Sequence, residues 1–206
     1  MSALPDPFLN LLRARRSVRR FTGRPVPRAM LEQLIEAAGW APSAGNRQDW
    51  FFIVAGALGL KTEMGEIVRR HWDSVLAANC EQDGGGELAE YVSGFDSFAS
   101  APALVAVCAR KLSEIQRRLL GVNALVSGGS LISAAMAAQN LMLAAHALGL
   151  GTCCMTGALA AREELEKILN VGRRHELICL VTVGFPAEEP SVPACKTVGE
   201  IARFME

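Results

Sequence analysis

The stretch Val122–Leu148 decides the fold, and it reads VNALVSGGSLISAAMAAQNLMLAAHAL. Large apolar residues occur on every side of the helix that this stretch predicts, which is typical of a buried helix. Its many Ala, Gly and Ser residues allow neighbouring backbones to approach closely. Gln139, Asn140 and His146 need polar partners inside, and their spacing excludes a membrane helix. We therefore expect a helix in the core or at the interface between two copies of the chain.

Segments on both sides of this helix predict strands. Leu177–Val183 is a continuous apolar run, which is typical of a central strand. Ala103–Ala109 predicts another buried strand, and Phe51–Ala55 is rich in β-branched and aromatic residues. Gly149 is a natural helix stop, and the residues from Gly151 to Gly157 predict a strand and a turn. At Gly157 the missing side chain allows a ligand to approach the backbone.

Shorter helices are predicted elsewhere. Asp6 and Pro7 are typical of an N-cap and a first helical residue, and that helix should run to Ala14. A second helix should begin at Pro27 and stop near Gly39, because its apolar residues recur at helical spacing. Ala160–Asn170 predicts a surface helix.

The residues from 58 to 98 form the least regular part of the chain. Leu60–His71 and Glu87–Phe98 can be helical, and the glycines in Asn79–Gly86 predict a flexible turn between them. We interpret this excursion as a lid or cap on a single domain that spans residues 1–206. Its residues His71 and Trp72 could contact a substrate or could simply pack locally.

The overall composition narrows the function. The 206 residues include 21 Lys and Arg and 21 Asp and Glu, so the chain lacks the basic excess of a nucleic-acid binder. The sequence shows neither a signal-peptide pattern nor an apolar run of about 18 residues that could span a membrane. The six cysteines form no Cys-x-x-Cys pair and mostly sit in apolar runs, which favours reduced thiols in the cytoplasm.

Side-chain motifs for catalysis are missing from the sequence. The three histidines lie at no spacing that suits metal ligands, and neither phosphate-loop glycine patterns nor a Gly-x-Ser-x-Gly motif occurs. We therefore name no catalytic side chain and no metal ligand. If the protein is an enzyme, a bound cofactor has to carry the chemistry.

Two polar segments are candidates for binding such a cofactor. Arg15–Arg19 reads RRSVR, and the planar guanidinium groups match phosphate oxygens. The alternative is a solvated basic helix end, which also suits the helix dipole. Pro42–Trp50 reads PSAGNRQDW and enters a strand directly, so its polar side chains could contact a ligand. The alternative is an ordinary connection between a helix and a strand.

The chain resembles the nitroreductase family of flavin enzymes in four segments that lie in the family's order and cover nearly the whole sequence. These segments are Arg15–Arg19, Pro42–Trp50, Ala138–Thr152, and Gly184–Pro186 together with Lys196. The resemblance implies an α+β fold with three α-β-α layers, a mixed and mainly antiparallel sheet and a long central helix. It also implies an intertwined homodimer with FMN at the interface.

The resemblance further implies which residues bind FMN. Its phosphate would be held by Arg15, Arg16, Ser17, Arg19 and Lys196. Its ring would be lined by Met155, Thr156 and Gly157, and the partner subunit would contribute Ser43, Ala44 and Asn46. NADH or NADPH would pass a hydride to flavin N5, and a small-molecule acceptor such as a nitroaromatic or a quinone would then take its place in a ping-pong cycle.

Two departures from the family pattern and one pair of cysteines invite another interpretation. Asp49 replaces a proline that is usual in the family, which predicts a less rigid and more acidic loop. Thr156 replaces a glutamate found in some members, which leaves the contacts to flavin N5 open. The pair Cys153–Cys154 could be a redox site, but its apolar flanks favour buried packing. Other reactions of the family, a flavin protein without turnover and a dimerising structural protein are the alternatives.

Overall fold

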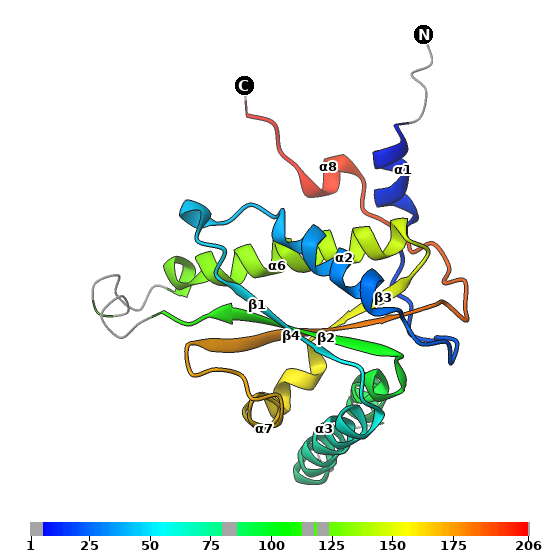
Figure 1. Ribbon diagram of the computed structural model, residues 1–206, viewed down its shortest axis with the longest axis vertical. Coiled ribbons are helices and arrows are strands. Elements are labelled where there is room, and N and C mark those ends of the chain that lie inside the picture. The colour runs from blue at the N-terminus through cyan, green and yellow to red at the C-terminus, as the bar shows by residue number, and fades with distance from the viewer. Residues whose placement is uncertain (1–5, 80–85, 113–117, 119–123, 206) are drawn as a thin grey trace.

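The computed structural model describes residues 6–79, 86–112, 118 and 124–205. Helices are labelled α, 3-10 turns η and strands β (Figure 1). Along the chain they are α1 (Pro7–Ala14), α2 (Arg28–Gly39), η1 (Ala44–Asn46), β1 (Trp50–Ala55), α3 (Leu58–Ala78), α4 (Glu87–Val92), η2 (Ser97–Ser100), β2 (Ala103–Arg110), α6 (Ala124–Ala147), β3 (Gly151–Met155), η3 (Gly157–Ala161), α7 (Arg162–Ile168), β4 (His175–Gly184) and α8 (Val198–Ile201).

The sheet has the strand order β1-β2-β4-β3, and neighbouring strands are antiparallel. The apolar run Leu177–Val183 lies in β4, between β2 and β3, so its prediction as a central strand is confirmed. An isolated parallel bridge joins Ser17 to Thr152 at the outer edge of β3. The sheet is therefore mixed and mainly antiparallel, as expected.

Helices cover both faces of this sheet, which gives the expected three α-β-α layers (Figure 1). On one face, α2 and α6 pack around a core that includes Leu34, Leu141 and Val181. On the other face, α3, η2 and α7 pack around a second core that includes Met64 and Leu180. The alternation of side chains along β4 explains how one strand feeds both cores, because Leu180 and Val181 point to opposite faces.

From residue 129 onward, helix α6 is buried along one side only. Its residues Ala134, Ala138 and Leu141 are almost fully buried. On its other side Ile132 and Met136 are 53% and 44% exposed. The prediction that the helix is buried all round is thus wrong for a single chain, because the apolar residues on this second side contact no other part of the described chain closely enough to be covered. Residues 122 and 123 of the predicted helix lie outside the described residues.

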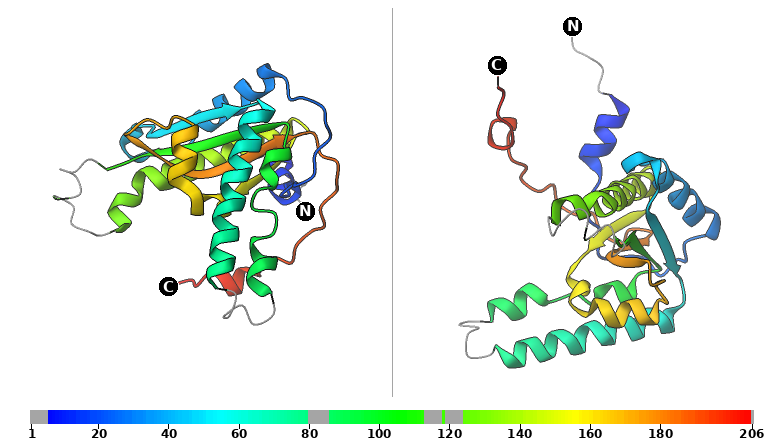
Figure 2. Two further views of the ribbon diagram at one scale, coloured as in Figure 1. Left: turned by 90° about the horizontal axis from the view of Figure 1, so that it is seen from below. Right: turned by 90° about the vertical axis from the view of Figure 1, so that its left-hand side faces the viewer.

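The excursion begins and ends in the core. Helix α3 is longer than predicted, and its residues Met64 and Val68 are buried, as is Phe98 at the other end. The predicted helix Glu87–Phe98 is wrong beyond Val92, since Gly94 at φ 83° breaks it into α4 and η2. The distal half of α3 and helix α4 project together beyond the sheet (Figure 2). Movement of the excursion as a lid stays a prediction. Because both ends of the excursion are buried, such movement would be confined to the projecting part.

The chain after β4 returns to the N-terminal segment before it leaves the body. Thr22 donates its backbone N–H to the Phe185 carbonyl at 2.9 Å, and Ala187 donates to the Arg20 carbonyl at 2.9 Å. The tail then extends on the same side as α1 (Figure 1). Its apolar residues Val198, Ile201 and Phe204 are exposed. They contribute nothing to the core of a single chain.

Candidate functional site

The arginine segment is fixed to the edge of the sheet. Val18 donates its backbone N–H to the Thr152 carbonyl at 2.9 Å, next to the Ser17–Thr152 bridge. The contact is close because position 151 is glycine: a Cβ there would lie 2.7 Å from the Val18 Cβ. The sequence places polar groups in this segment, but the apolar Val18 holds it against β3.

A carboxylate from the tail holds the same segment from the other side. One oxygen of Glu188 accepts hydrogen bonds from the backbone N–H groups of Arg19 at 2.7 Å and Arg20 at 3.0 Å. These hydrogen bonds lower the pKa of Glu188 below its ordinary value. The backbone of the segment is thus fixed while its side chains stay free to turn toward a ligand.

Arg16 is the exception among the arginines. Its guanidinium group donates to the backbone carbonyls of Arg13 at 2.5 Å and Arg15 at 2.8 Å. It therefore caps the C-terminal end of α1. This matches the alternative interpretation of the arginine segment as a basic helix end. The structure supports this role for Arg16, while Arg15 and Arg19 keep their guanidinium groups for other partners.

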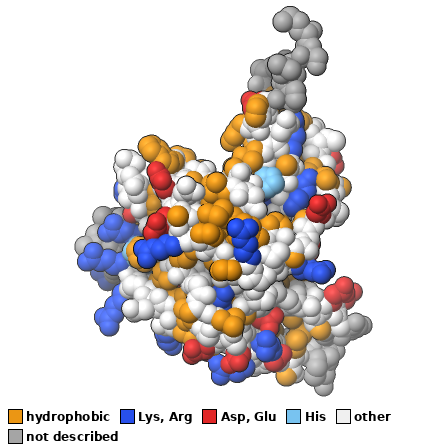
Figure 3. Space-filling view, turned by 45° about the vertical axis from the view of Figure 1, so that its right-hand side comes forward, with side chains coloured by type: hydrophobic (Ala, Val, Ile, Leu, Met, Phe, Trp, Pro, Cys, Tyr) orange, Lys and Arg blue, Asp and Glu red, His pale blue; other side chains and the backbone are white. Residues whose placement is uncertain are grey.

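A pocket of about 720 Å³ opens where this segment meets the end of β3. Arg19 and Arg20 form one wall, and the residues from Cys153 to Gly157 form the floor. The structure thus brings Arg19 together with Met155, Thr156 and Gly157, as the site prediction requires. Figure 3 shows apolar and basic side chains close together in the middle of the face that it presents.

A second wall of this pocket is aromatic and comes from the excursion. Trp72, Tyr91 and Phe95 line it, and the Phe95 ring lies 5.4 Å from the rings of both Trp72 and Tyr91. Trp72 also donates its indole N–H to the Gly157 carbonyl at 3.2 Å. Sequence reasoning weighed Trp72 and missed Tyr91 and Phe95. One feature of the sequence could have pointed to Tyr91: it is the single tyrosine of the chain and lies within the excursion.

Arg15 and Arg16 open onto a neighbouring cavity of about 790 Å³, which lies between the end of α6, β3 and the tail. Ser17 lies at the edge of β3, where a bridge joins it to Thr152, and it lines neither cavity. The five-residue segment therefore spans both openings. An anionic group at this edge would meet cationic side chains from either side.

The remaining predicted residues do not join these cavities within one chain. Ser43, Ala44 and Asn46 lie around η1, before β1, at the edge of the sheet opposite β3. Lys196 lies in the exposed tail and lines neither of the two cavities. A second chain or a movement of the tail would be needed to bring them to the pocket.

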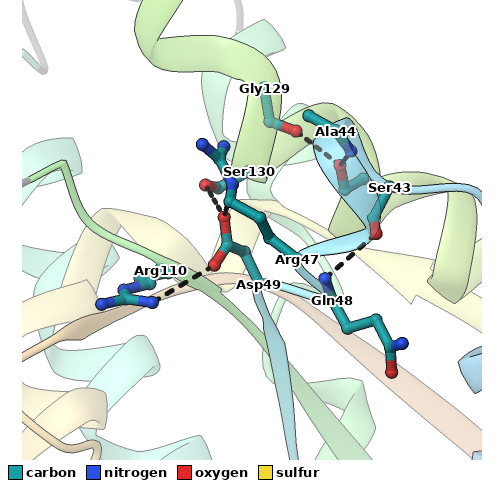
Figure 4. A network of polar contacts seen from close by, with 9 residues as sticks. Ser43, Ala44, Arg47, Gln48, Asp49, Arg110, Gly129 and Ser130 are labelled. Atoms are coloured by element: carbon teal, nitrogen blue, oxygen red, sulfur yellow. Dashed lines mark hydrogen bonds and ion pairs between the residues drawn. The ribbon is translucent and has the colours of Figure 1, made fainter.

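The loop that carries Ser43 and Asn46 is held by the buried carboxylate of Asp49 (Figure 4). Asp49 accepts from Arg47 Nε at 2.9 Å and from Ser130 Oγ at 3.1 Å, and Arg110 lies 3.6 Å away. These partners come from the loop, α6 and the end of β2. The expected acidity of the loop is therefore offset, because two guanidinium groups and a hydroxyl group neutralise and fix the carboxylate. The lower rigidity stays a prediction.

Two further bonds stabilise the same loop. Ser43 Oγ accepts from the backbone N–H of Gln48 at 3.0 Å, and the Ala44 N–H donates to Ser133 Oγ at 3.4 Å. Ser133 in turn donates to the Gly129 carbonyl at 2.7 Å. The loop is thus built onto helix α6, whose exposed apolar side lies next to it.

The two adjacent cysteines differ in environment. Cys153 is buried and Cys154 is exposed, so the prediction of buried packing holds for the first and is wrong for the second. β3 is an edge strand, and alternate residues of a strand face opposite sides. Burial raises the pKa of Cys153. The neighbouring thiol of Cys179 and, to a smaller extent, the positive charge of Arg15 lower the pKa of Cys154 to about 7.

The residues present fit a planar, anionic cofactor better than a metal ion. The pocket carries guanidinium groups at one end and backbone, apolar and aromatic surface at the other, and its volume lies in the usual range for small-molecule sites. Among residues 6–79, 86–112, 118 and 124–205, no group of His, Cys, Asp and Glu is arranged to hold a metal ion. Within the same residues, no helix is both long and apolar enough to cross a membrane.

Comparisons with known proteins agree with this geometry. The model of the Nitroreductase family matches residues 12–185. A Caenorhabditis elegans homologue of iodotyrosine dehalogenase 1 is 28% identical over 195 residues, which cover 92% of this chain. The chain spans only 58% of the length of that protein.

Two further similarities concern a bacterial relative and a solved structure. A Bacillus subtilis protein named as an NAD(P)H nitroreductase is 27% identical over 184 residues, which cover 85% of this chain and 88% of that protein. The crystal structure of a BluB-like flavoprotein from Clostridium difficile superposes with a TM-score of 0.83 at 22% identity and covers 98% of this chain and 100% of that one. This last similarity shows the fold.

Proposed function

Because this chain belongs to the nitroreductase family, we propose that it is an FMN-dependent oxidoreductase that uses NADH or NADPH to reduce a nitroaromatic, a quinone or a similar acceptor. When bound, FMN would supply two-electron chemistry by accepting a hydride from the nicotinamide and passing it to the acceptor. The observation that carries this proposal is the pocket that Arg19 lines together with Met155, Thr156 and Gly157.

The arginine segment would bind the phosphate. Arg15, Ser17 and Arg19 offer guanidinium and hydroxyl donors at the edge of β3, and charge-assisted hydrogen bonds of this kind are the strong ones. Arg16 would act indirectly by capping α1, and Lys196 would have to reach the site with the tail. The fixed backbone of the segment means that little conformational freedom is lost when an anion binds.

The other end of the pocket would orient the ring and the acceptor. Met155 ends the edge strand β3, and Thr156 and Gly157 follow it, so the backbone groups here that no other contact occupies can face a planar ring. Trp72, Tyr91 and Phe95 would exclude water from the reacting faces and stack against an aromatic acceptor. No protein acid or base is assigned to the reaction.

The site would be completed in a homodimer. The exposed apolar side of α6, with Leu131, Ile132 and Met136, is suited to an apolar partner, and the tail adds Phe204. The loop with Ser43 and Asn46 is anchored to α6 through Ser133, so a dimer formed through α6 would carry this loop toward the partner's pocket. Light scattering of the purified protein should give twice the mass of the chain, and a monomer would contradict this part of the proposal.

The visible spectrum tests the central proposal. The purified protein, loaded with FMN if necessary, should show the absorption bands of oxidised flavin, and these bands should bleach when NADH or NADPH is added without air. Bands that persist would favour a flavin protein without turnover. If FMN never binds, the proposed cofactor is wrong.

A second candidate is reductive dehalogenation of a halogenated phenol. It is favoured by the aromatic wall of the pocket and by the similarity to the iodotyrosine dehalogenase homologue. Anaerobic incubation of the reduced protein with iodotyrosine should then release iodide, and a Tyr91→Ala variant should release it more slowly. Turnover of quinones without iodide release would favour the first candidate.

A further inference from the structure

Arg20 supplies a positive charge that the proposed cofactor does not need. It lines the pocket of about 720 Å³ together with Arg19, and it is exposed. A phosphate monoester carries a charge of about −1.5 to −2 near neutral pH, which the guanidinium groups of Arg15 and Arg19 would balance. The charge of Arg20 then remains for another anion in the same pocket.

The backbone of Arg20 is fixed, whereas its side chain is unpaired. Its N–H donates to Glu188 at 3.0 Å, and its carbonyl accepts from the N–H of Ala187 at 2.9 Å. Among the residues that the structure describes, no carboxylate forms an ion pair with its guanidinium group. Two backbone hydrogen bonds and, to a smaller extent, the charge of Arg20 lower the pKa of Glu188, but this carboxylate lines the neighbouring cavity.

The rest of the pocket suits an aromatic ring. Trp72, Tyr91 and Phe95 form one wall, in which the Phe95 ring lies 5.4 Å from each of the other two. The indole N–H of Trp72 is already donated to the Gly157 carbonyl, so this wall presents ring surface. No carboxylate side chain occurs among the described residues that line the pocket, so an anion that enters it meets no negative charge there.

We propose that the pocket selects electron acceptors that are anionic as well as aromatic, and that Arg20 is the specificity-determining residue that binds their carboxylate or sulfonate group. This inference rests on the proposed function, because the acceptor is taken to enter the pocket that holds the flavin. A guanidinium group can donate two parallel hydrogen bonds to a carboxylate, and such charge-assisted bonds are about twice as strong as neutral ones.

The role of Arg20 is binding and orientation, and it takes no part in the transfer of electrons. The aromatic wall would stack against the ring of the acceptor while Arg20 holds the anionic substituent at the exposed side. An interaction of this kind is made equally in the ground state and in the transition state. It should therefore lower KM and leave kcat nearly unchanged.

A matched pair of acceptors tests the proposal. Para-nitrobenzoate and para-nitrobenzamide have nearly the same shape, but only the benzoate is charged at neutral pH. With the FMN-loaded protein and NADPH or NADH, the KM of the benzoate should be at least about tenfold lower, with similar kcat values. The difference should shrink as the salt concentration rises, because ions screen an exposed charge.

Three variants assign this preference to Arg20. Arg20→Gln keeps a hydrogen-bond donor without the charge and should bring the two KM values close together. Arg20→Lys keeps the charge without the planar fork and should retain part of the preference. Arg28→Gln, which breaks an exposed pair with Glu32 and lines neither cavity, should keep the preference of the parent. Arg20→Gln should also weaken FMN binding less than Arg19→Gln does.

Stopped-flow measurements separate the acceptor from the nicotinamide, which carries phosphates of its own. Arg20→Gln should slow the oxidation of reduced flavin by low concentrations of para-nitrobenzoate at least about tenfold. It should change the reduction of flavin by NADPH much less. The reverse pattern would assign Arg20 to the nicotinamide and overturn the proposal.

Isothermal titration calorimetry gives a readout besides turnover. The oxidised, FMN-loaded protein should bind para-nitrobenzoate at least about tenfold more tightly than para-nitrobenzamide, and Arg20→Gln should remove this difference. Equal affinities would overturn the inference, while flavin reduction by NADPH would leave the proposed function standing. If FMN does not bind or is not reduced, the proposed function fails, and the same titration of the parent and Arg20→Gln proteins decides whether Arg20 binds anionic aromatic compounds.

Discussion

The indole N–H of Trp72 points at the carbonyl oxygen of Gly157, 3.2 Å away, and thereby fastens the excursion to the floor of the pocket. Trp72→Phe keeps a ring against Phe95 but leaves this carbonyl without its donor, so it should lower the free energy of unfolding by about 0.5–1.5 kcal/mol. Trp72→Ala also removes the ring and should cost more, about 3–5 kcal/mol. Urea denaturation measures both, and a Trp72→Phe variant as stable as the parent would show that the hydrogen bond is unimportant.

Gly151 should tolerate no side chain. A Cβ at this position would lie 2.7–2.8 Å from three atoms of Val18, so Gly151→Ala should push the arginine segment away from β3 and destabilise the protein by about 1–3 kcal/mol. FMN affinity should fall with it. Val18→Ala in the same chain should restore part of both losses, which a double-mutant cycle would reveal. As a control, Gly59→Ala, whose Cβ would meet nothing within 4 Å, should leave FMN affinity unchanged.

Arg19 should matter for the cofactor and little for the fold. Arg19→Gln removes a positive charge from the pocket wall, and the loss of a charge-assisted hydrogen bond should weaken FMN binding by roughly 10-fold or more. Arg19→Glu should abolish binding while the chain stays folded. Fluorescence titration with FMN gives the affinities. Arg28→Gln, which breaks an exposed pair with Glu32 on α2, is the control, and an equal loss there would refute the assignment of Arg19 to the phosphate.

Asp49 should anchor the loop through its charge. Asp49→Ala would leave Ser130 without its acceptor and Arg47 without its ion partner, at a cost of about 1–3 kcal/mol. Asp49→Asn keeps an acceptor for Ser130 and should lose less. Chemical denaturation compares them with Asp96→Asn, which breaks a more exposed pair with Arg69 and should change stability least. If Asp49→Ala were as stable as the parent, the network would not hold the loop.

The carboxylate of Glu188, in the tail, should make the stability of the folded protein depend on pH in the acidic range. Its pKa is lowered in the folded protein by the N–H groups of Arg19 and Arg20, so the unfolded chain binds the proton more readily. The stability that this carboxylate contributes is therefore complete above its ordinary pKa of about 4.3 and is lost as the pH falls through the lower, folded value. Glu188→Gln keeps an acceptor but cannot titrate. Its unfolding free energy should depend less on pH in this acidic window, and an unchanged pH dependence would contradict the assignment.

The elements that sequence reasoning found are those that a local pattern specifies. The apolar run of β4 and the capping pair Asp6–Pro7 are examples, and Asp6 indeed accepts a hydrogen bond from the Phe8 N–H at 2.8 Å. The helix predicted over Glu87–Phe98 fails at Gly94, where a positive φ ends it. Local periodicity could not reveal which glycine would adopt that conformation.

The missed parts of the site depend on distant partners. Asp49 is fixed by Ser130, 81 residues away in the sequence, and the order of strands that exposes Cys154 follows from how β3 reaches the sheet. Phe95 meets Gly157 only because α3 folds back across the second face of the sheet. The segments proposed to bind the cofactor could be predicted from their residue types. The residues that contact these segments could be identified only from the three-dimensional arrangement.

The bridge between Ser17 and Thr152 has a consequence for solubility. β3 is the outermost strand on its side, and an unpaired strand edge is a template on which another chain can add by backbone hydrogen bonding. The Val18 N–H occupies the Thr152 carbonyl and so shields part of this edge. Any change that detaches the arginine segment should therefore do more than weaken a ligand: it should expose an aggregation-prone edge, and protection against self-association is built into the same five residues that are proposed to bind phosphate.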